Sequence, residues 1–384
     1  MKHLKKSPAI LLLMLLTIII GSWTFPSGFS GWYFDKAQHS DQIKEVIQDR
    51  VYISAGCEGG VNSIAVNATR INNAEPGATN IIFQSKDGGQ TWQDISKDLP
   101  VNEQPEDFFA GESDVYLRVQ DELYRSKSNL ENPVWQNENT LDLRNTSIAF
   151  NRSGVIAFNY EGQIFQKTSS GSWLPIYTNF KKHLVRTIFE SSDGTLFIGC
   201  DFGLYKSADK GQSWKQVLNE GWVMDIVESE GVLIGSGQKG IMRSADNGEH
   251  WESVISEGGV GIAIERIDGG FAAITYNSKT QSRRIRISMD DGKTWTAIDG
   301  GLQPSMNISS IKQVGKYLLC GHPDGIFRSS DMGKTWNLVH ASVDNALKPI
   351  VYAWSLAPSR DDRRVFKLYV SNNVLYAVAR NAGC

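Results

Sequence analysis

The chain has 384 residues, of which 41% are hydrophobic and 21% charged, and it contains 36 glycines and 11 tryptophans. This composition is typical of a globular, turn-rich protein and excludes extensive disorder. The formal net charge is −3, so no overall basic field would attract phosphate groups, and we expect no nucleic-acid partner.

The chain begins with features of an export signal. Lys2, Lys5 and Lys6 precede an apolar run from Ala9 to Ile20, and turn-prone residues follow. This order is typical of a secretory signal, and the run is shorter than the roughly 20 residues of a membrane span. Cleavage near Gly28-Phe29-Ser30 and an uncleaved signal anchor both stay open, and this segment is the only expected route to a membrane. We expect the mature part outside the cytoplasm, as a periplasmic, cell-surface or secreted monomer.

The four cysteines are too few and too far apart for a disulfide framework or a C-x-x-C metal site. Cys200 and Cys320 each end an apolar, strand-like run, so we expect them to be buried thiols. Cys57 and Cys384 lie near the two ends of the chain. A disulfide between them is a hypothesis that requires those ends to meet.

An eight-residue motif, S-x-D-x-G-x-[ST]-W, recurs along the chain. Five copies are well preserved, and one of them, Ser244 to Trp251, has His250 at the seventh place. Two eroded copies, 124–135 and 164–173, lack the motif aspartate. The defining residues of the five copies are Ser85, Asp87, Gly89, Trp92, Ser207, Asp209, Gly211, Trp214, Ser244, Asp246, Gly248, Trp251, Ser288, Asp290, Gly292, Trp295, Ser329, Asp331, Gly333 and Trp336.

The spacing of the motif predicts the fold. Between copies, four short strand-like runs alternate with Gly-rich turns, as in 183–217. Successive motif tryptophans lie 37 to 44 residues apart, which is the length of one four-stranded propeller blade. The tryptophans are Trp92, Trp135, Trp173, Trp214, Trp251, Trp295 and Trp336.

We therefore predict an all-β fold, a single β-propeller of four-stranded antiparallel blades, with seven blades favoured over eight. Residues 51–57 and 61–70 are expected to supply the first two strands of the first blade. Residues 351–380 contain three further strand-like runs, which either close the ring or form most of an eighth blade. The predicted domains are 1–30, a signal peptide or anchor; 31–47, a short lead; and 48–384, the propeller with its C-terminal ring-closing strands.

The residue types of the motif suit a structural hairpin. The aspartate can accept N–H groups that point into the turn, the glycine permits positive φ, and the tryptophan can pack between blades. Asp290-Asp291-Gly292 resembles part of a Ca²⁺ loop but lacks the further carboxylates that such a loop needs. We expect the motif residues to be structural, with no catalytic, metal or cofactor role.

The motif copies resemble the BNR or Asp-box superfamily of sialidase-like propellers over about residues 50 to 340. That superfamily includes sialidases, two-propeller xyloglucanases, sortilin ectodomains and, closest in scale, photosystem II stability/assembly factor propellers. The resemblance to sialidases implies an R-I-P motif before the first copy, an arginine triad, a tyrosine nucleophile and an acidic proton donor. Here the corresponding stretch holds only Arg50-Val-Tyr-Ile and Thr69-Arg-Ile-Asn. Arg118, Arg186 and Arg266 are scattered and expected to be surface cations.

Two functions from different classes remain. The first is an exported, non-enzymatic scaffold that binds a protein or glycan partner, with assembly of a membrane or envelope complex as one role. The alternative is a glycoside hydrolase with a degenerate or unrecognised active site, which would need two carboxylates across a cleft. Candidate acids outside the motif are expected to be turn or surface residues; they are Glu161, Asp201, Glu265 and Asp324.

A ligand is expected on the face opposite the motif hairpins, where the loops between second and third strands gather. Loop aromatics beside amides and carboxylates there suit sugar or peptide binding. His322 is expected to face solvent, because no second His or Cys lies at metal-ligand spacing. The candidate ligand-binding residues are Tyr160, Glu161, Asp201, Phe202, Trp222, Gln238, Lys239, Tyr276, His322 and Asp324.

Overall fold

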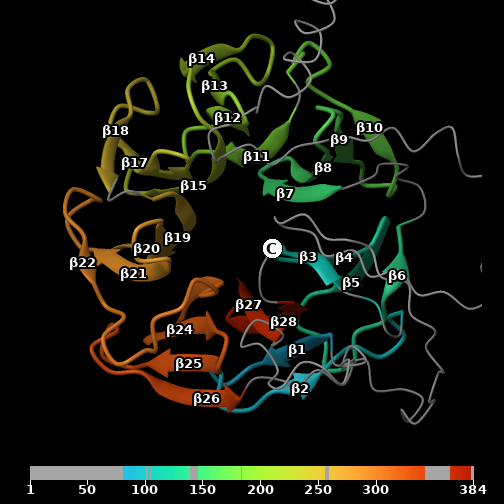
Figure 1. Ribbon diagram of the computed structural model, residues 1–384. Coiled ribbons are helices and arrows are strands. Elements are labelled where there is room, and N and C mark those ends of the chain that lie inside the picture. Colours follow the sequence, from blue (N-terminus) through green and yellow to red (C-terminus); the bar gives the residue numbers. More distant parts are fainter. Residues whose placement is uncertain are drawn as a thin grey trace, which may run out of the picture. The chain divides into compact units, whose positions relative to one another are not determined.

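The computed structural model describes residues 81–100, 103, 105–138, 146–182, 184–255, 259–341 and 364–381, all within one unit that begins at Asn73. All regular structure in these residues is β-strand, arranged as seven four-stranded antiparallel sheets. The sheets are the blades of a β-propeller (Figure 1). The predicted fold class and the blade number of seven are confirmed.

We number the blades from the one that contains both the first and the last strand of the chain. The strands of each blade are given in order from the innermost to the outermost. Blade 1 is β27 (Arg364–Ser371), β28 (Val374–Asn381), β1 (Ile82–Ser85) and β2 (Gln93–Asp94); blade 2 is β3 (Pro105–Ala110), β4 (Asp114–Val119), β5 (Glu122–Lys127) and β6 (Gln136–Asn137); blade 3 is β7 (Ser147–Asn151), β8 (Gly154–Phe158), β9 (Ile164–Lys167) and β10 (Trp173–Pro175).

Blades 4 to 7 follow the same order along the chain. Blade 4 is β11 (Val185–Glu190), β12 (Leu196–Cys200), β13 (Gly203–Ser207) and β14 (Lys215–Leu218); blade 5 is β15 (Val223–Ser229), β16 (Val232–Gly237), β17 (Gly240–Ser244) and β18 (Glu252–Ile255); blade 6 is β19 (Gly261–Ile267), β20 (Gly270–Asn277), β21 (Ser282–Ser288) and β22 (Thr296–Ala297); blade 7 is β23 (Ser310–Val314), β24 (Tyr317–His322), β25 (Gly325–Ser329) and β26 (Asn337–Ala341).

The ring closes within blade 1, which combines strands from far apart in the sequence. β1 pairs with β28 from Ile82↔Val378 to Ser85↔Leu375, and β28 pairs with β27. Figure 1 shows the C-terminal strands inside the same blade as β1 and β2. Of the two alternatives for the C-terminal runs, ring closure is therefore confirmed and an eighth blade is wrong.

The expected origin of the inner strands of this blade was also wrong. The sequence pattern predicts them in 51–57 and 61–70, but β27 and β28 fill those positions in the sheet. Residues 51–70 themselves lie outside the described residues. The sequence pattern could not separate the two origins, because both regions contain apolar runs of strand length.

The hydrophobic core lies between the blades. Middle strands such as β12 and β17 are buried along their whole length, because a neighbouring blade covers each of their faces. Each apolar cluster joins two adjacent blades: Ile234 of blade 5, for example, packs with Phe271 and Trp295 of blade 6. The motif tryptophans thus pack against the preceding blade, as predicted.

The five complete motif copies share one hydrogen-bond pattern. In the first copy, Ser85 Oγ donates to Asp87 Oδ1 at 2.8 Å and accepts the Gly89 N–H at 2.9 Å. The Thr91 N–H and hydroxyl donate to the Asp87 carboxylate at 2.9 and 2.6 Å. Gly89 has a φ of 84°, as expected for the motif glycine. The motif aspartates satisfy turn N–H groups, which supports their structural role.

These hydrogen bonds make the fold sensitive to acid. Those from the seventh motif residue lower the pKa of Asp209, Asp290 and Asp331 from 3.8 to about 2. A carboxylate whose pKa is lower in the folded state stabilises the fold above pH 3.8 and loses that effect as the pH falls towards 2. We expect the unfolding temperature to drop across this window, and Asp331→Asn to flatten the drop. Asp291 is exposed and lies outside this hydrogen-bond network, so Asp291→Asn should leave the pH dependence of the unfolding temperature unchanged. Equal effects of Asp331→Asn and Asp291→Asn would contradict the assignment of the acid sensitivity to the motif aspartates.

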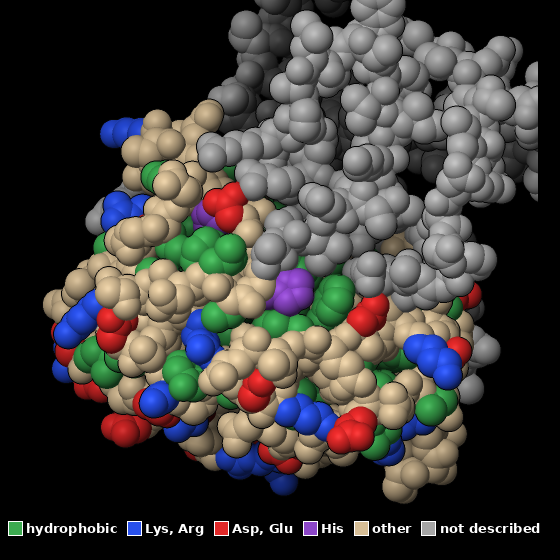
Figure 2. All heavy atoms as spheres, turned by 90° about the horizontal axis from the view of Figure 1, so that it is seen from below, with side chains coloured by type: hydrophobic (Ala, Val, Ile, Leu, Met, Phe, Trp, Pro, Cys, Tyr) green, Lys and Arg blue, Asp and Glu red, His purple; other side chains and the backbone are tan. Residues whose placement is uncertain are grey.

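Three further sequence predictions concern cysteines, charge and the membrane. Cys200 and Cys320 are free and buried, as predicted, whereas Cys57 and Cys384 lie outside the described residues. In the side view of Figure 2, cations and anions are interspersed rather than gathered by sign. The described part of the chain includes no helix long and apolar enough to cross a membrane; the predicted signal segment lies outside that part.

Candidate functional site

The two faces of the propeller carry different connections. Blade 4 shows how the two ends of a blade differ. At one end of the β11–β12 pair, Val185 pairs with Cys200, next to the β12–β13 loop. At the other end, Glu190 pairs with Leu196, next to the motif hairpin between β13 and β14. We call the face with the second-to-third-strand loops the loop face and the opposite one the motif face. All inner strands begin at the loop face, because each blade repeats this order of strands.

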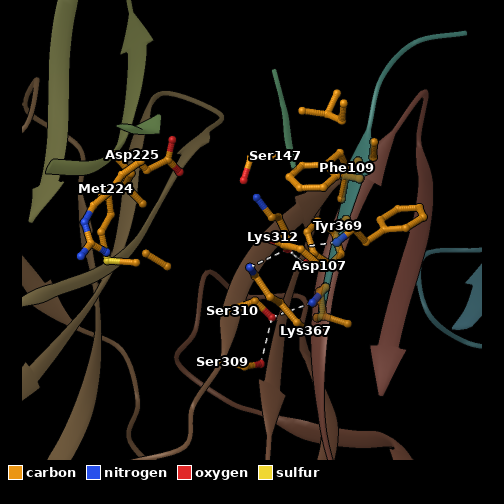
Figure 3. A pocket seen from close by; sticks show the side chains of 18 of the residues that line it. Asp107, Phe109, Ser147, Met224, Asp225, Ser309, Ser310, Lys312, Lys367 and Tyr369 are labelled. Carbon is orange, nitrogen blue, oxygen red and sulfur yellow. Dashed lines mark hydrogen bonds and ion pairs between the residues drawn. The ribbon is translucent and has the colours of Figure 1, made fainter. Parts of the chain in front are cut away.

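A cavity of about 530 Å³ runs between the inner strands along the axis of the ring. Residues from all seven inner strands line it, together with Tyr160 from a loop-face turn and Arg118. Asp225 lies on one wall, and Asp107, Lys312 and Lys367 lie across the cavity from it (Figure 3). In the described part of the chain, all seven blades contribute residues to the lining of this channel.

β-Bulges set which side chains enter the channel. In four inner strands, one extra residue interrupts the pairing with the second strand; these residues are Glu106, Arg186, Met224 and Ile262. A bulge rotates the following side chain relative to a simple alternation. Asp107 and Asp225 directly follow a bulge, and each accepts a hydrogen bond from the next backbone N–H, at 3.0 and 2.8 Å. The two aspartates therefore hold equivalent positions.

Two residues of blade 1 bind one carboxylate oxygen of Asp107. Lys367 Nζ lies 3.2 Å from Asp107 Oδ1, and the Tyr369 hydroxyl donates to the same oxygen at 2.8 Å. Burial alone would raise the pKa of Asp107, but the charges of Lys367 and Arg380 outweigh it and lower that pKa. Burial, together with the Asp107 charge, raises the pKa of Tyr369 well above its ordinary value. The pair is an ionised carboxylate beside a protonated phenol.

A second charged group spans blades 5, 6 and 7. Lys312 Nζ pairs with Glu265 Oε2 at 2.5 Å. Burial would lower the pKa of Lys312, but the charge and hydrogen bond of Glu265 outweigh it, so that pKa rises. Asp225 is open to the channel yet surrounded by protein, and this desolvation raises its pKa to about 6. Asp225 is thus poised to change charge near neutral pH.

At the mouth of the channel, Arg186 is held by aromatic rings. Its guanidinium carbon lies 5.6 Å from the Tyr160 ring and 5.5 Å from the Trp222 ring, and its Nε pairs with Asp201. The neighbouring Phe202 is 69% exposed. This loop-face cluster combines a fixed cation with exposed aromatic surface, an arrangement typical of interaction hot spots.

The structure brings together part of the predicted ligand set. Tyr160, Asp201 and Trp222 meet around Arg186, and the Gln238 N–H donates to the Trp222 carbonyl at 3.0 Å. The other predicted residues are distributed around the loop face. Glu161 is next to Tyr160 in the sequence, Phe202 is next to Asp201, and Lys239 pairs with Glu220. Tyr276 lies in the β20–β21 hairpin, and His322 and Asp324 flank the β24–β25 turn.

Four expectations about single residues were wrong. His322 is only 2% exposed, and its Nε2 lies 2.8 Å from the Gln303 carbonyl oxygen while its Nδ1 accepts the Asp324 N–H at 3.1 Å. It is a buried loop anchor rather than a solvent-facing residue. Arg118 and Arg186 line the channel instead of the outer surface, and Glu265 forms the partly buried pair with Lys312.

Sequence reasoning missed the residues of the channel wall. Asp107, Asp225, Lys312, Lys367 and Tyr369 lie in the inner strands rather than in loops. Their one shared signal is a charged or phenolic side chain in the first strand of a blade, a position that faces the axis. Among the described residues, no group of three or more His, Cys, Asp or Glu is placed to hold a metal ion.

A recess on the motif face lies between blades 2 and 3, the two blades with eroded motifs. It measures about 820 Å³, and an ion network lies along it. Glu138 Oε2 pairs with Lys167 Nζ at 2.6 Å, and Glu138 Oε1 pairs with Arg125 Nε at 2.7 Å. The Lys167 ammonium also lies over the Trp173 ring at 5.2 Å. The network joins the two blades where the motif aspartate is missing.

No protein-family model matches the chain, and no curated protein matches it. The solved structures that resemble it are β-propellers of several kinds. The extracellular domain of a putative one-component system from B. thetaiotaomicron has a TM-score of 0.53 at 11% identity, covering 66% of this chain and 36% of that one. An ancestral GH74 enzyme has a TM-score of 0.51 at 15% identity, covering 74% and 44%.

YCF48 bound to D1 peptide has a TM-score of 0.48 at 14% identity, covering 74% of this chain and 94% of that one. The chain therefore spans less than half the length of the first two structures. At these identities the likeness shows the fold alone. Because propellers of this kind include both enzymes and non-enzymatic proteins, the function must be argued from the site.

Proposed function

We propose that the protein is a non-catalytic propeller, exported from the cytoplasm, that binds a polypeptide partner on its loop face and at the mouth of its channel. The observation that carries the proposal is the packing of Arg186 against the Tyr160 and Trp222 rings, with the exposed Phe202 next in sequence to its ion partner Asp201. Tyr160 and Phe202 are 42% and 69% exposed, although aromatic side chains gain from burial. The export part rests on the sequence of residues 1–30.

The charge pattern of the channel supports a polypeptide over a plain sugar. Ion-paired side chains such as Arg186, Lys312 and Lys367 line the cavity, and Met224, Ile262 and Phe150 contribute apolar surface to it. A ligand that fits both must carry polar as well as apolar groups. Extended peptides have that character, with side chains on alternate sides.

A peptide selection tests the proposal. A displayed library of random 12-residue peptides is selected on the folded protein, and the enriched peptides are titrated against variants. Tyr160→Ala with Phe202→Ala should weaken binding about 30-fold or more, because each aromatic hot spot contributes roughly 1–2 kcal/mol. The matched control, Leu174→Ala with Leu338→Ala, removes two exposed apolar side chains from outer strands and should leave binding unchanged. Equal binding by both double variants would overturn the proposal.

A glycoside hydrolase is the second candidate, favoured by one observation. The channel holds a carboxyl with a pKa of about 6, Asp225, and one with a lowered pKa, Asp107; such separated pairs are typical of acid and base catalysts. Against this, Lys367 and Tyr369 already occupy Asp107. Hydrolysis of any member of a fluorogenic glycoside panel, abolished by Asp225→Asn, would establish this alternative.

A further inference from the structure

Asp225 differs from the other charged residues of the channel because it has no ionic partner. Every cation that lines the cavity is paired with a carboxylate: Arg118 with Glu106, Arg186 with Asp201, Lys312 with Glu265, and Lys367 with Asp107. No Lys or Arg in the described part of the chain forms an ion pair with Asp225. Lys312 and Lys367 act on it only at longer range. The channel therefore presents one uncompensated negative charge.

The equivalent aspartate shows what such a position binds. Asp107 also follows a bulge and accepts the next backbone N–H, and the same carboxylate oxygen contacts an ammonium and accepts from a phenol. Asp225 has the same backbone bond, from the Ile226 N–H at 2.8 Å, but faces the open cavity instead of a neighbouring lysine. The place taken by Lys367 at Asp107 has no counterpart at Asp225.

The surroundings of Asp225 would suit a cation on an aliphatic stem. Met224 and Ile262, the two bulge residues of β15 and β19, line the same cavity, and Met224 is 40% exposed. Tyr160 extends the lining to the loop face. Methylene groups can pack along such apolar surface while a terminal charge reaches a carboxylate. Figure 3 shows Asp225 and Met224 together on the wall opposite Lys312.

We propose that Asp225 is the recognition site for a cationic group, a lysine ammonium, an arginine guanidinium or a free amino terminus, which the polypeptide partner inserts into the channel. This inference rests on the proposed function and names the chemistry that the partner must carry. Enclosure by the inner strands strengthens the pair, because water competes poorly there. Binding requires the ionised carboxylate, so it should weaken progressively as the pH falls below about 6.

The first experiment needs no partner. The Asp225 carboxyl carbon is followed by NMR in ¹³C-aspartate-labelled full-length protein, with butylammonium, butylguanidinium or neutral butanol as the probe. Without a probe, we expect the pKa of Asp225 to be about 6. Either cation should lower that pKa by at least about one unit, which corresponds to a tenfold preference of the cation for the ionised carboxylate. Butanol should not move it. The other charged groups near Asp225 are Lys312, Glu265, Lys367 and Arg186, and their pairs should persist across this range.

Two variants make the result specific. Asp225→Asn should abolish the chemical-shift changes that the cations cause in the channel, whereas Asp291→Asn, an exposed carboxylate on the motif face, should leave them intact. An Asp225 titration that neither cation moves would overturn the proposal. A cation effect that survives Asp225→Asn would overturn it as well, because it would place the cation elsewhere.

The second experiment uses the selected peptides. We expect each selected peptide to contain Lys, Arg or an essential free amino terminus. Replacing that Lys or Arg by norleucine, or acetylating that terminus, should weaken binding at least about tenfold. The same change should have no effect on Asp225→Asn protein. If no peptide is selected, the proposed function fails while the butylammonium titration still decides the role of Asp225. Selected peptides that bind equally well without any cation would contradict the inference and leave the proposed function standing.

Discussion

Deletion of residues 364–384 is expected to abolish cooperative unfolding of the whole propeller. The deletion removes β27 and β28, the inner half of blade 1, and exposes the pairing edge of β1. Phe366, Leu368 and Leu375 are at most 1% exposed, and burying each such side chain contributes about 1.5–3 kcal/mol. The total is comparable with the roughly 5–15 kcal/mol by which a domain is stable. Calorimetry of the truncated chain should show no sharp transition.

This deletion also separates the observed closure from the one expected from the sequence. If residues 51–70 supplied the inner strands of the first blade, the truncated chain would still hold seven complete blades and would unfold cooperatively. A synthetic peptide of residues 362–384, added to the truncated chain, should restore the transition by pairing with β1. A sharp transition without the peptide would contradict closure through β28.

Glu138→Ala is expected to cost about 3–5 kcal/mol of unfolding free energy, the range for removing one partner of a buried ion pair. The Glu138 side chain is 8% exposed and bridges Lys167 of blade 3 to Arg125 of blade 2. Without it, the Lys167 ammonium, itself 12% exposed, stays buried with no carboxylate. Urea denaturation of the variant and the parent protein measures the difference.

A matched pair elsewhere provides the control. Glu220 pairs with Lys239 at 2.7 Å, a similar geometry, but the Glu220 and Lys239 side chains are 69% and 50% exposed. Ion pairs exposed on both sides contribute little, so Glu220→Ala should leave the unfolding free energy almost unchanged. If Lys167→Met, combined with Glu138→Leu, recovers most of the loss, the cost arises from the uncompensated charge. Equal losses in Glu138→Ala and Glu220→Ala would contradict this explanation.

The fold was largely predictable because the motif is local. Ser85, Asp87, Gly89 and Thr91 interact across two to four residues, so their spacing specifies the hairpin directly. The repeat length then predicts the blade and the tryptophan predicts the packing between blades. Ring closure was not predictable in the same way. The pairing of Ile82 with Val378 links the two ends of the propeller, and nothing in either segment specifies the other.

The candidate site was only partly predictable. The loop aromatics Tyr160 and Trp222 could be found because loop positions can be read from the repeat. The channel wall could not, because its charged pairs combine strands from different blades, as Lys312 of β23 and Glu265 of β19 do. A bulge at Met224 also changes which side chain of β15 faces the axis. A sequence pattern records alternation along one strand but not the partner that another blade supplies.

The central claim is that ligands enter the channel from the loop face, opposite the motif hairpins. Site-specific photocrosslinking tests it most directly, with benzoylphenylalanine placed at Phe202 on the loop face or at Leu174, 55% exposed, beside the motif tryptophan of blade 3. With a selected peptide as the probe, the account predicts a crosslinked adduct from position 202 and none from position 174. An adduct from position 174 and none from position 202 would contradict it.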